Sequence, residues 1–125
     1  IMLGTNDLKQ RFSLPPGDIA AGARVLVDIA VSSETGRDGA PPTVLLVCPP
    51  PTGKLSEYAD MFAGAGEKSV RLDRYYRVVA AEAGCCYLNA GEVVTSSDID
   101  GIHLEADQHD ALGRAVAAEV RRCGG

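Results

Sequence analysis

One short segment constrains the fold more than any other. Residues 43–51 read TVLLVCPPP. The run 44–48 is continuously apolar, which is typical of a strand that is buried on both faces of a parallel sheet. Three consecutive prolines then end the strand, because proline cannot donate a backbone hydrogen bond to a β-ladder. Parallel strands buried in this way are covered by helices on both faces, so the segment predicts an α/β fold.

The rest of the chain alternates strands and helices around this segment. We expect strands at 1–3, 44–48 and 85–90, and helices from about Asp18, at about 56–62, 67–83 and 105–122. Apolar residues at helical spacing define the expected inward faces of three helices: Ile19, Ala23, Leu26 and Ile29; Val70, Tyr75, Val78 and Val79; Leu112, Val116 and Val120. The order β-α-β-α-β-α predicts a parallel sheet.

Composition narrows the class of protein. With 125 residues and a net charge of −5, the chain fits one domain and lacks the basic stripe of a nucleic-acid surface. No apolar run reaches the roughly 18 residues of a membrane span, so we expect no membrane partner. Cys48, Cys85 and Cys86 lie in apolar segments, which predicts buried free thiols and a cytoplasmic location. Alanine-rich helix faces would allow close packing between subunits, so a homo-oligomer stays an alternative to a monomer.

Three loops leave the carboxyl ends of the expected strands, and ligand sites of open α/β sheets lie beyond these ends. Their sequences are GTND (4–7), PPPTGKL (49–55) and NAGEVVTSSDIDGIH (89–103). The second loop resembles a phosphate loop only through Gly53 and Lys54, and its remaining residues do not fit that motif. We therefore look for polar chemistry in the first and third loops, and expect no cofactor.

The third loop places Asp100 three residues before His103, with Gly101 between them. Glycine permits a tight turn, so the two side chains can meet. A carboxylate that accepts the Nδ1 proton of an imidazole leaves Nε2 free as a base. In the first loop, Asn6 and the backbone N–H of Gly4 are candidate donors to an oxyanion. A capped surface loop and a plain Asx-turn are the structural alternatives.

Together, GTND and DGIHL resemble two sequence blocks of the SGNH hydrolase superfamily, the GDSL esterases and lipases. The likeness extends through IMLGTNDLK, the proline-terminated strand and DGIHLEADQHDALGRAVAAEV, in that order. The proline-rich loop after the middle strand is most similar to the bacterial arylesterase and acyltransferase branch, whose members act on small acyl esters. The resemblance implies a flavodoxin-like three-layer α/β/α sandwich and a Ser-Asp-His triad.

Carried over by position, the resemblance makes His103 the general base, Asp100 its orienting acid and Asn6 an oxyanion donor. Gly4 would shape the turn that presents Asn6. The family's Gly-Asp-Ser block is missing here, so the nucleophile is not expected in this chain. Two leading βα units, roughly 70 to 90 residues, would carry it. Residues 1–125 are thus expected to be the C-terminal part of one SGNH hydrolase domain, with the N-terminal part of the same enzyme as its partner.

Two other functions fit the same residues. A non-catalytic flavodoxin-like binding module, or an inactive fragment, would make the Asp100/His103 pair incidental. A metal-dependent hydrolase would use Asp100, His103 and Asp98, although no standard zinc spacing supports it and our prediction includes no metal. His109 is expected to be a helix residue packed beneath the site.

Overall fold

The computed structural model describes residues 1–124. Two strands, β1 (Leu45–Cys48) and β2 (Cys86–Asn89), pair in parallel, with Leu45 opposite Cys86 and Cys48 opposite Asn89. The crossover between them contains the helices α2 (Ala65–Ser69) and α3 (Leu72–Ala83). β1 ends at the three prolines, as the sequence predicts.

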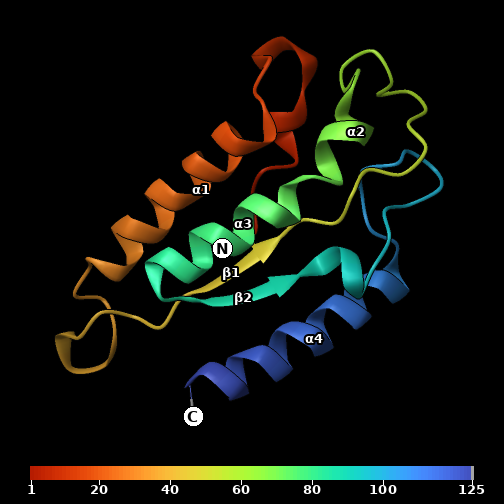
Figure 1. Ribbon diagram of the computed structural model, residues 1–125. Helices are drawn as coiled ribbons and strands as arrows, with labels where there is room; N and C mark the ends of the chain where they lie inside the picture. The colour runs from red at the N-terminus through yellow and green to blue at the C-terminus, as the bar shows by residue number, and fades with distance from the viewer. Residues whose placement is uncertain (125) are drawn as a thin grey trace.

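Helices cover both faces of this sheet (Figure 1). The helices α1 (Pro16–Val31) and α3 pack together on one face, and α4 (Ala106–Gly124) lies on the other. The larger core cluster, centred on Leu46 and Tyr76, lies under α1 and α3. A smaller cluster, which includes Val47 and Leu112, lies under α4. The three-layer α/β/α architecture with a parallel sheet is therefore confirmed.

The amino-terminal segment runs beside β1 without forming a regular strand. The Ile1 amino group donates to the Leu45 carbonyl at 2.7 Å, and the Val47 N–H donates to the Ile1 carbonyl at 2.8 Å. These two bonds follow a parallel ladder around Leu46. The ladder goes no further, and the Leu3 carbonyl accepts the Tyr76 hydroxyl at 2.7 Å instead. The strand predicted at 1–3 is thus only a single ladder contact.

The predicted helix at 67–83 is broken into α2 and α3, and 56–62 forms turns rather than a helix. The break at Val70 and Arg71 changes which residues face the core. Leu72 and Tyr76 are fully buried, whereas Val70 is 62% exposed and Val78 is 51% exposed. The predicted inward face was therefore wrong for Val70 and Val78, because a single helical period was assumed across two helices.

The outer helices show a similar correction. On α1 the buried residues include Ile19, Ala23 and Val27, whereas Leu26 and Ile29 are exposed. α1 packs mainly against α3, so a narrow stripe is sufficient to bury its inward face. On α4 Leu112 is buried but Val120 is 54% exposed. Both helices leave apolar side chains on the surface.

The cysteines depart from the prediction at one position. Cys86 at the start of β2 forms a disulfide with Cys123 near the end of α4. The prediction of free thiols is therefore wrong for Cys86. α4 lies against the sheet so that its last turn reaches the first residue of β2, which the sequence spacing does not reveal. Cys48 is a buried free thiol, and Cys85 is free and half-buried.

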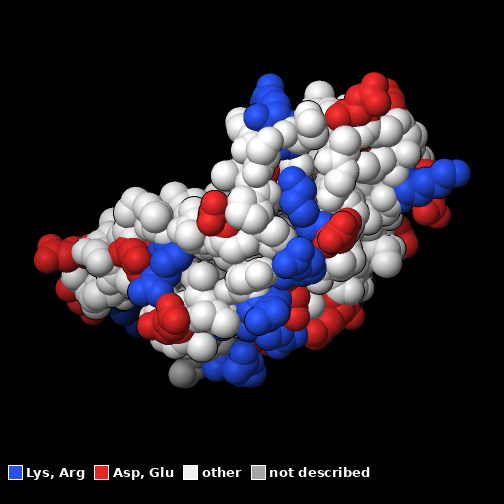
Figure 2. All heavy atoms as spheres, turned by 45° about the horizontal axis from the view of Figure 1, so that its top comes forward, with Lys and Arg blue, Asp and Glu red and all other residues white. Residues whose placement is uncertain are grey.

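The surface carries both signs of charge. Figure 2 shows a line of basic side chains across one face, with acidic side chains beside it. Some of these charges are paired between elements, as in the contacts of Arg24 with Glu82 and of Arg77 with Glu92. Within residues 1–124 no helix combines the length and apolar character needed to cross a membrane.

Candidate active site

The loops that follow β1 and β2 are joined by hydrogen bonds at the carboxyl edge of the sheet. The Gly53 N–H donates to the Gly101 carbonyl at 2.8 Å. The Ser56 hydroxyl donates to the Ile99 carbonyl at 2.7 Å, and the Ser96 hydroxyl donates to the Pro51 carbonyl at 2.8 Å. The proline-rich loop therefore supports the segment that carries Asp100 and His103.

Asp100 and His103 meet within one turn. Nδ1 of His103 lies 2.6 Å from Oδ2 of Asp100. The other carboxylate oxygen, Oδ1, accepts the backbone N–H groups of Ile102 at 2.8 Å and of His103 at 2.9 Å. Both carboxylate oxygens of Asp100 are thus hydrogen-bonded to His103 or to its neighbour Ile102.

These hydrogen bonds favour the ionised form of the Asp100 carboxyl. The hydrogen bond from the His103 side chain, with the backbone N–H groups of His103 and Ile102, lowers the pKa of the Asp100 carboxyl to about 2. Asp100 is therefore a carboxylate at every ordinary pH. With Nδ1 facing this acceptor, the imidazole donates from Nδ1 and presents Nε2 as its free base. The His103 side chain is 68% exposed, so the imidazole is accessible to a reactant.

Gly101 makes this turn possible. Its φ of +78° lies in the left-handed region, and a Cβ at this position would lie 2.7 Å from the backbone of Lys54. Any larger residue would therefore separate the proline-rich loop from the turn. The aromatic ring of Tyr58 lies edge-on to the His103 ring, with 6.1 Å between their centroids. His103 is thus held by Asp100 on one side and contacted by Tyr58 on another.

Asn6 lies at the same groove as His103. The groove has a volume of about 280 Å³ and its lining is Met2, Thr5, Asn6, Pro49, Pro50, Ile102, His103, Leu104 and His109. Asn6 begins a short 3-10 turn (Asn6–Leu8) that the buried side chain of Leu8 anchors. The groove therefore combines two imidazoles and one amide with mostly apolar walls.

Gly4 has a different environment. It is buried and does not line the groove; a Cβ on Gly4 would lie 2.4 Å from the hydroxyl oxygen of Tyr76. Its φ of +125° also favours glycine. Gly4 therefore lies in the turn before Asn6 in a conformation that favours glycine, and its position gives no support to a direct donor role.

The other residues named from the sequence are placed as follows. His109 is exposed on the first turns of α4 and lines the groove beside His103. Asp98 is exposed and lies at a separate hollow with Gly53 and Gly91. Among residues 1–124 no group of three or more Asp, Glu, His or Cys side chains is arranged to hold a metal ion.

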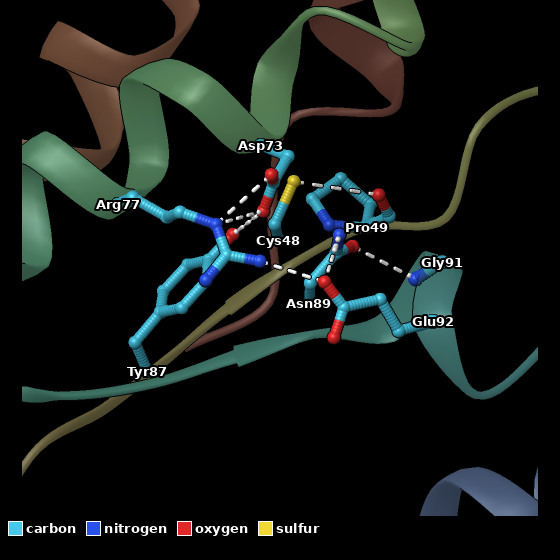
Figure 3. Close-up of polar contacts among 8 residues, drawn as sticks. All are labelled: Cys48, Pro49, Asp73, Arg77, Tyr87, Asn89, Gly91 and Glu92. Carbon is cyan, nitrogen blue, oxygen red and sulfur yellow. Dashed lines mark hydrogen bonds and ion pairs between the residues drawn. The ribbon is translucent and has the colours of Figure 1, made fainter.

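A second polar cluster lies between α3 and β2 (Figure 3). The Tyr87 hydroxyl donates to Asp73 at 2.6 Å, and Arg77 bridges Asp73 at 2.9 Å and Glu92 at 2.7 Å. Cys48 lies beside this cluster, and burial raises the pKa of its thiol to about 12. A thiol that stays protonated is a poor nucleophile, so Cys48 is not a rival to a serine.

Sequence reasoning missed two residues that organise the site loop. Ser97 is 4% exposed, and its hydroxyl donates to the Glu105 carboxylate at the start of α4. Two adjacent serines in a polar loop carry no sign of which one is buried. The acid at 105, just before a helix, is a signal for a cap, but its partner eight residues earlier is decided only by the loop's path.

Solved structures of esterases are similar to this chain. The native aryl esterase of M. smegmatis and Est24, a carbohydrate acetylesterase from Sinorhizobium meliloti, each match with a TM-score of 0.92 and 36% identity. A carbohydrate acetylesterase family member from Sinorhizobium meliloti matches with a TM-score of 0.90 and 33% identity. Each match covers 98% of this chain, and the chain spans 59% of each of these esterases. No family model and no curated protein matches the sequence.

In fold the chain is a three-layer α/β/α domain of the kind found in these esterases. It belongs to the SGNH hydrolase superfamily and matches the carboxyl-terminal portion of that fold. The resemblance inferred from GTND and DGIHL is thereby confirmed at the level of the family.

Proposed function

We propose that this chain supplies the base, its orienting acid and an oxyanion donor to a serine esterase or acyltransferase. The observation that carries the proposal is the single groove that Asn6 and His103 share. A base with a free Nε2 and an amide donor are the two groups that acyl transfer requires beside a nucleophile. The similar structures are aryl and carbohydrate acetyl esterases, which supports this reaction class.

The proposed chemistry gives His103 the proton transfers and Asn6 the stabilisation of the oxyanion. His103 Nε2 takes the proton of a serine as its hydroxyl oxygen bonds to the acyl carbonyl carbon. The carbonyl oxygen gains the negative charge and receives the Asn6 amide N–H. Collapse of this intermediate, with the proton returned by His103 to the leaving alcohol, gives an acyl-enzyme. Water or another alcohol then repeats the sequence, giving hydrolysis or acyl transfer.

The shape of the groove favours a small acyl ester. About 280 Å³ lined by Met2, Pro49, Ile102 and Leu104 is a small, mainly apolar space. Its lining contains no Asp, Glu, Lys or Arg, and its ring nitrogens come from His103 and His109. A short acyl chain is therefore a better fit than a long or strongly charged one.

The nucleophile is proposed to come from the N-terminal part of the same enzyme. The segment 1–3 bonds to β1 on one side only, and its side chains are exposed: Ile1 37%, Met2 42% and Leu3 55%. Next to it, Leu26 lines a cavity of about 350 Å³ with Leu3 and Gly4. An open strand edge with apolar neighbours is the place where further strands of a sheet would add. We call the protein that contains both this N-terminal part and residues 1–125 the complete enzyme.

Labelling with a fluorophosphonate tests the proposal. Intact mass spectrometry is performed on residues 1–125 alone and on the complete enzyme, each before and after the probe. The proposal expects the probe mass on a serine of the N-terminal part, and no gain on residues 1–125 alone. If the complete enzyme stays unlabelled, or if a serine of this chain reacts, the proposed division of the triad is wrong, and the binding-module interpretation replaces it in the first case.

A further inference from the structure

The buried residue Ser97 forms hydrogen bonds with every second residue from 99 to 105, in the loop that carries the proposed base. The Ser97 N–H donates to the His103 carbonyl at 2.7 Å, and the Ser97 carbonyl accepts the Gly101 N–H at 2.8 Å. The Ser97 hydroxyl oxygen accepts the Ile99 N–H at 3.0 Å. The same hydroxyl donates to the Glu105 carboxylate. Residues 99, 101, 103 and 105 are thus all bonded to Ser97.

This pattern fixes both members of the pair without touching the reacting atoms. Ile99 and Gly101 flank Asp100, so their bonds to Ser97 set the direction of the carboxylate. His103 and Glu105 are each bonded to Ser97, so the backbone of His103 is fixed relative to α4. The His109 N–H donates to the Glu105 carbonyl at 2.9 Å, which makes Glu105 the N-cap residue of α4. The Ser97 hydroxyl therefore joins the loop to the helix.

Burial of the Ser97 hydroxyl strengthens its hydrogen bonds. Only Ser69 and Ser97 are buried polar residues among those described, with 2% and 4% exposure. A hydrogen bond from a buried hydroxyl to a carboxylate is stronger than one between neutral groups. Loss of that hydroxyl would leave the Ile99 N–H without its acceptor and the Glu105 carboxylate without its donor. Two of the four bonds that Ser97 makes to this loop would be lost together.

We infer that Ser97, acting with Glu105, is the positioning residue that holds the Asp100–His103 pair in its productive geometry. The catalytic consequence rests on the proposed function, whereas the effect on the pair itself does not. Ser97→Ala should let the turn between 97 and 105 relax, so that Nδ1 of His103 no longer faces Asp100 in every molecule. Misplacement of a catalytic group by about 1 Å costs roughly 100-fold in rate.

Two measurements test the inference. The first is nitrogen-15 NMR of the His103 ring in residues 1–125, which reports which ring nitrogen carries the proton. Wild type should show the proton on Nδ1, and Ser97→Ala should show a mixture of both forms. The second is kcat of the complete enzyme, which Ser97→Ala should lower roughly 10- to 100-fold with little change in KM.

Matched variants separate positioning from stability. Ser69→Ala also removes a buried hydroxyl, which donates to the Gly66 carbonyl at 3.0 Å and accepts the Thr52 N–H at 3.1 Å. It should lower Tm in the same way as Ser97→Ala and leave the His103 ring unchanged. Glu105→Gln keeps an acceptor oxygen and should retain most of kcat, whereas Glu105→Ala should resemble Ser97→Ala.

The outcomes are distinct for the two proposals. Unchanged NMR and kcat in Ser97→Ala overturn the positioning role, as do equal NMR changes in Ser69→Ala and Ser97→Ala. If His103→Ala leaves turnover intact, the proposed function fails. In that case the His103 ring spectrum of Ser97→Ala alone decides whether Ser97 positions the pair.

Discussion

The Asp100–His103 pair and the Asp73–Arg77–Tyr87 cluster both use a carboxylate with close hydrogen-bond donors, yet they differ in what remains free. In the cluster each side chain is bonded to another across α3 and β2 (Figure 3). In the pair, the Asp100 carboxylate is bonded through both oxygens, whereas the ring of His103 is bonded through Nδ1 and lines a groove. Under the proposed function, reactivity depends on one free ring nitrogen beside a carboxylate whose hydrogen bonds are all made.

The two regions also differ in their support. The cluster joins two regular elements, so it is expected to contribute to stability. The pair sits on a loop with a 68% exposed histidine, so its removal is expected to affect chemistry and leave the fold intact. Each of the following predictions separates these two effects, in order of decreasing size.

The largest effect is expected for His103→Ala. Loss of the base should reduce kcat of the complete enzyme by about 10⁴-fold or more. The free energy of unfolding should change little, because the side chain is mostly exposed. Steady-state kinetics and urea denaturation measure the two quantities. Residual turnover close to wild type would remove His103 from the mechanism.

The disulfide tests stability at a distance from the pair. Cys86→Ser/Cys123→Ser opens a link over a sequence separation of 37, which should lower the free energy of unfolding by about 3–4 kcal/mol. Cys85→Ser is the control, because Cys85 is an adjacent free thiol. Denaturation with and without reductant compares them. Equal stabilities for the two variants would show that the disulfide does not stabilise the chain.

Asn6→Ala should lower kcat of the complete enzyme roughly 10²- to 10³-fold, the usual cost of losing one oxyanion donor. KM should change less, because the amide acts mainly on the transition state. Asn6→Asp is a sharper variant, since it keeps the shape but cannot donate from a carboxylate. Measured kcat for Asn6→Asp near the wild-type value would exclude the donor role.

Asp73→Ala should affect the Asp73–Arg77–Tyr87 cluster and leave the Asp100–His103 pair unchanged. The Tyr87 hydroxyl would lose its acceptor and Arg77 its partner, so the free energy of unfolding should fall by about 1–3 kcal/mol. Asp110→Ala removes a carboxylate from an exposed pair with Arg114 and should cost much less. Turnover of both variants should match wild type after correction for unfolded protein. A selective loss of kcat in Asp73→Ala would link the cluster to the chemistry.

The stability of the chain is also expected to depend on alkaline pH. Burial raises the pKa of the Cys48 thiol to about 12, and burial with the bond to Asp73 raises the pKa of Tyr87 as well. Above about pH 9 the unfolded thiol loses its proton and the folded thiol does not. Stability should therefore fall as pH rises, by up to roughly 1.4 kcal/mol per pH unit for each group.

Denaturation curves between pH 8 and pH 11 measure this slope. Cys48→Ala should flatten it relative to wild type, even though the variant is less stable overall. The Asp100 carboxyl acts in the opposite direction: its pKa is lowered to about 2, so its contribution is present above pH 4 and is lost as pH falls toward 2. An unchanged alkaline slope in Cys48→Ala would contradict a protonated buried thiol.

Much of the site could be predicted from the sequence because its key contact is local. Asp100 and His103 are three residues apart, and Gly101 supplies the one conformation that lets them meet. Asn6 could be assigned to the same edge because parallel strands end together. Ser97 could not be identified, since its burial depends on how the loop folds back from Ile99 to Glu105.

The sequence by itself determined the strand at 45–48, its stop at the prolines, the alternation of helices and strands and the position of Asp100 beside His103. Those features depend on local backbone preferences and on one hydrophobic period. The tertiary structure decided the break before Leu72, the exposure of Val78 and the disulfide between Cys86 and Cys123. Each of these depends on which surfaces meet across the sheet, and such contacts join residues that are far apart in the chain.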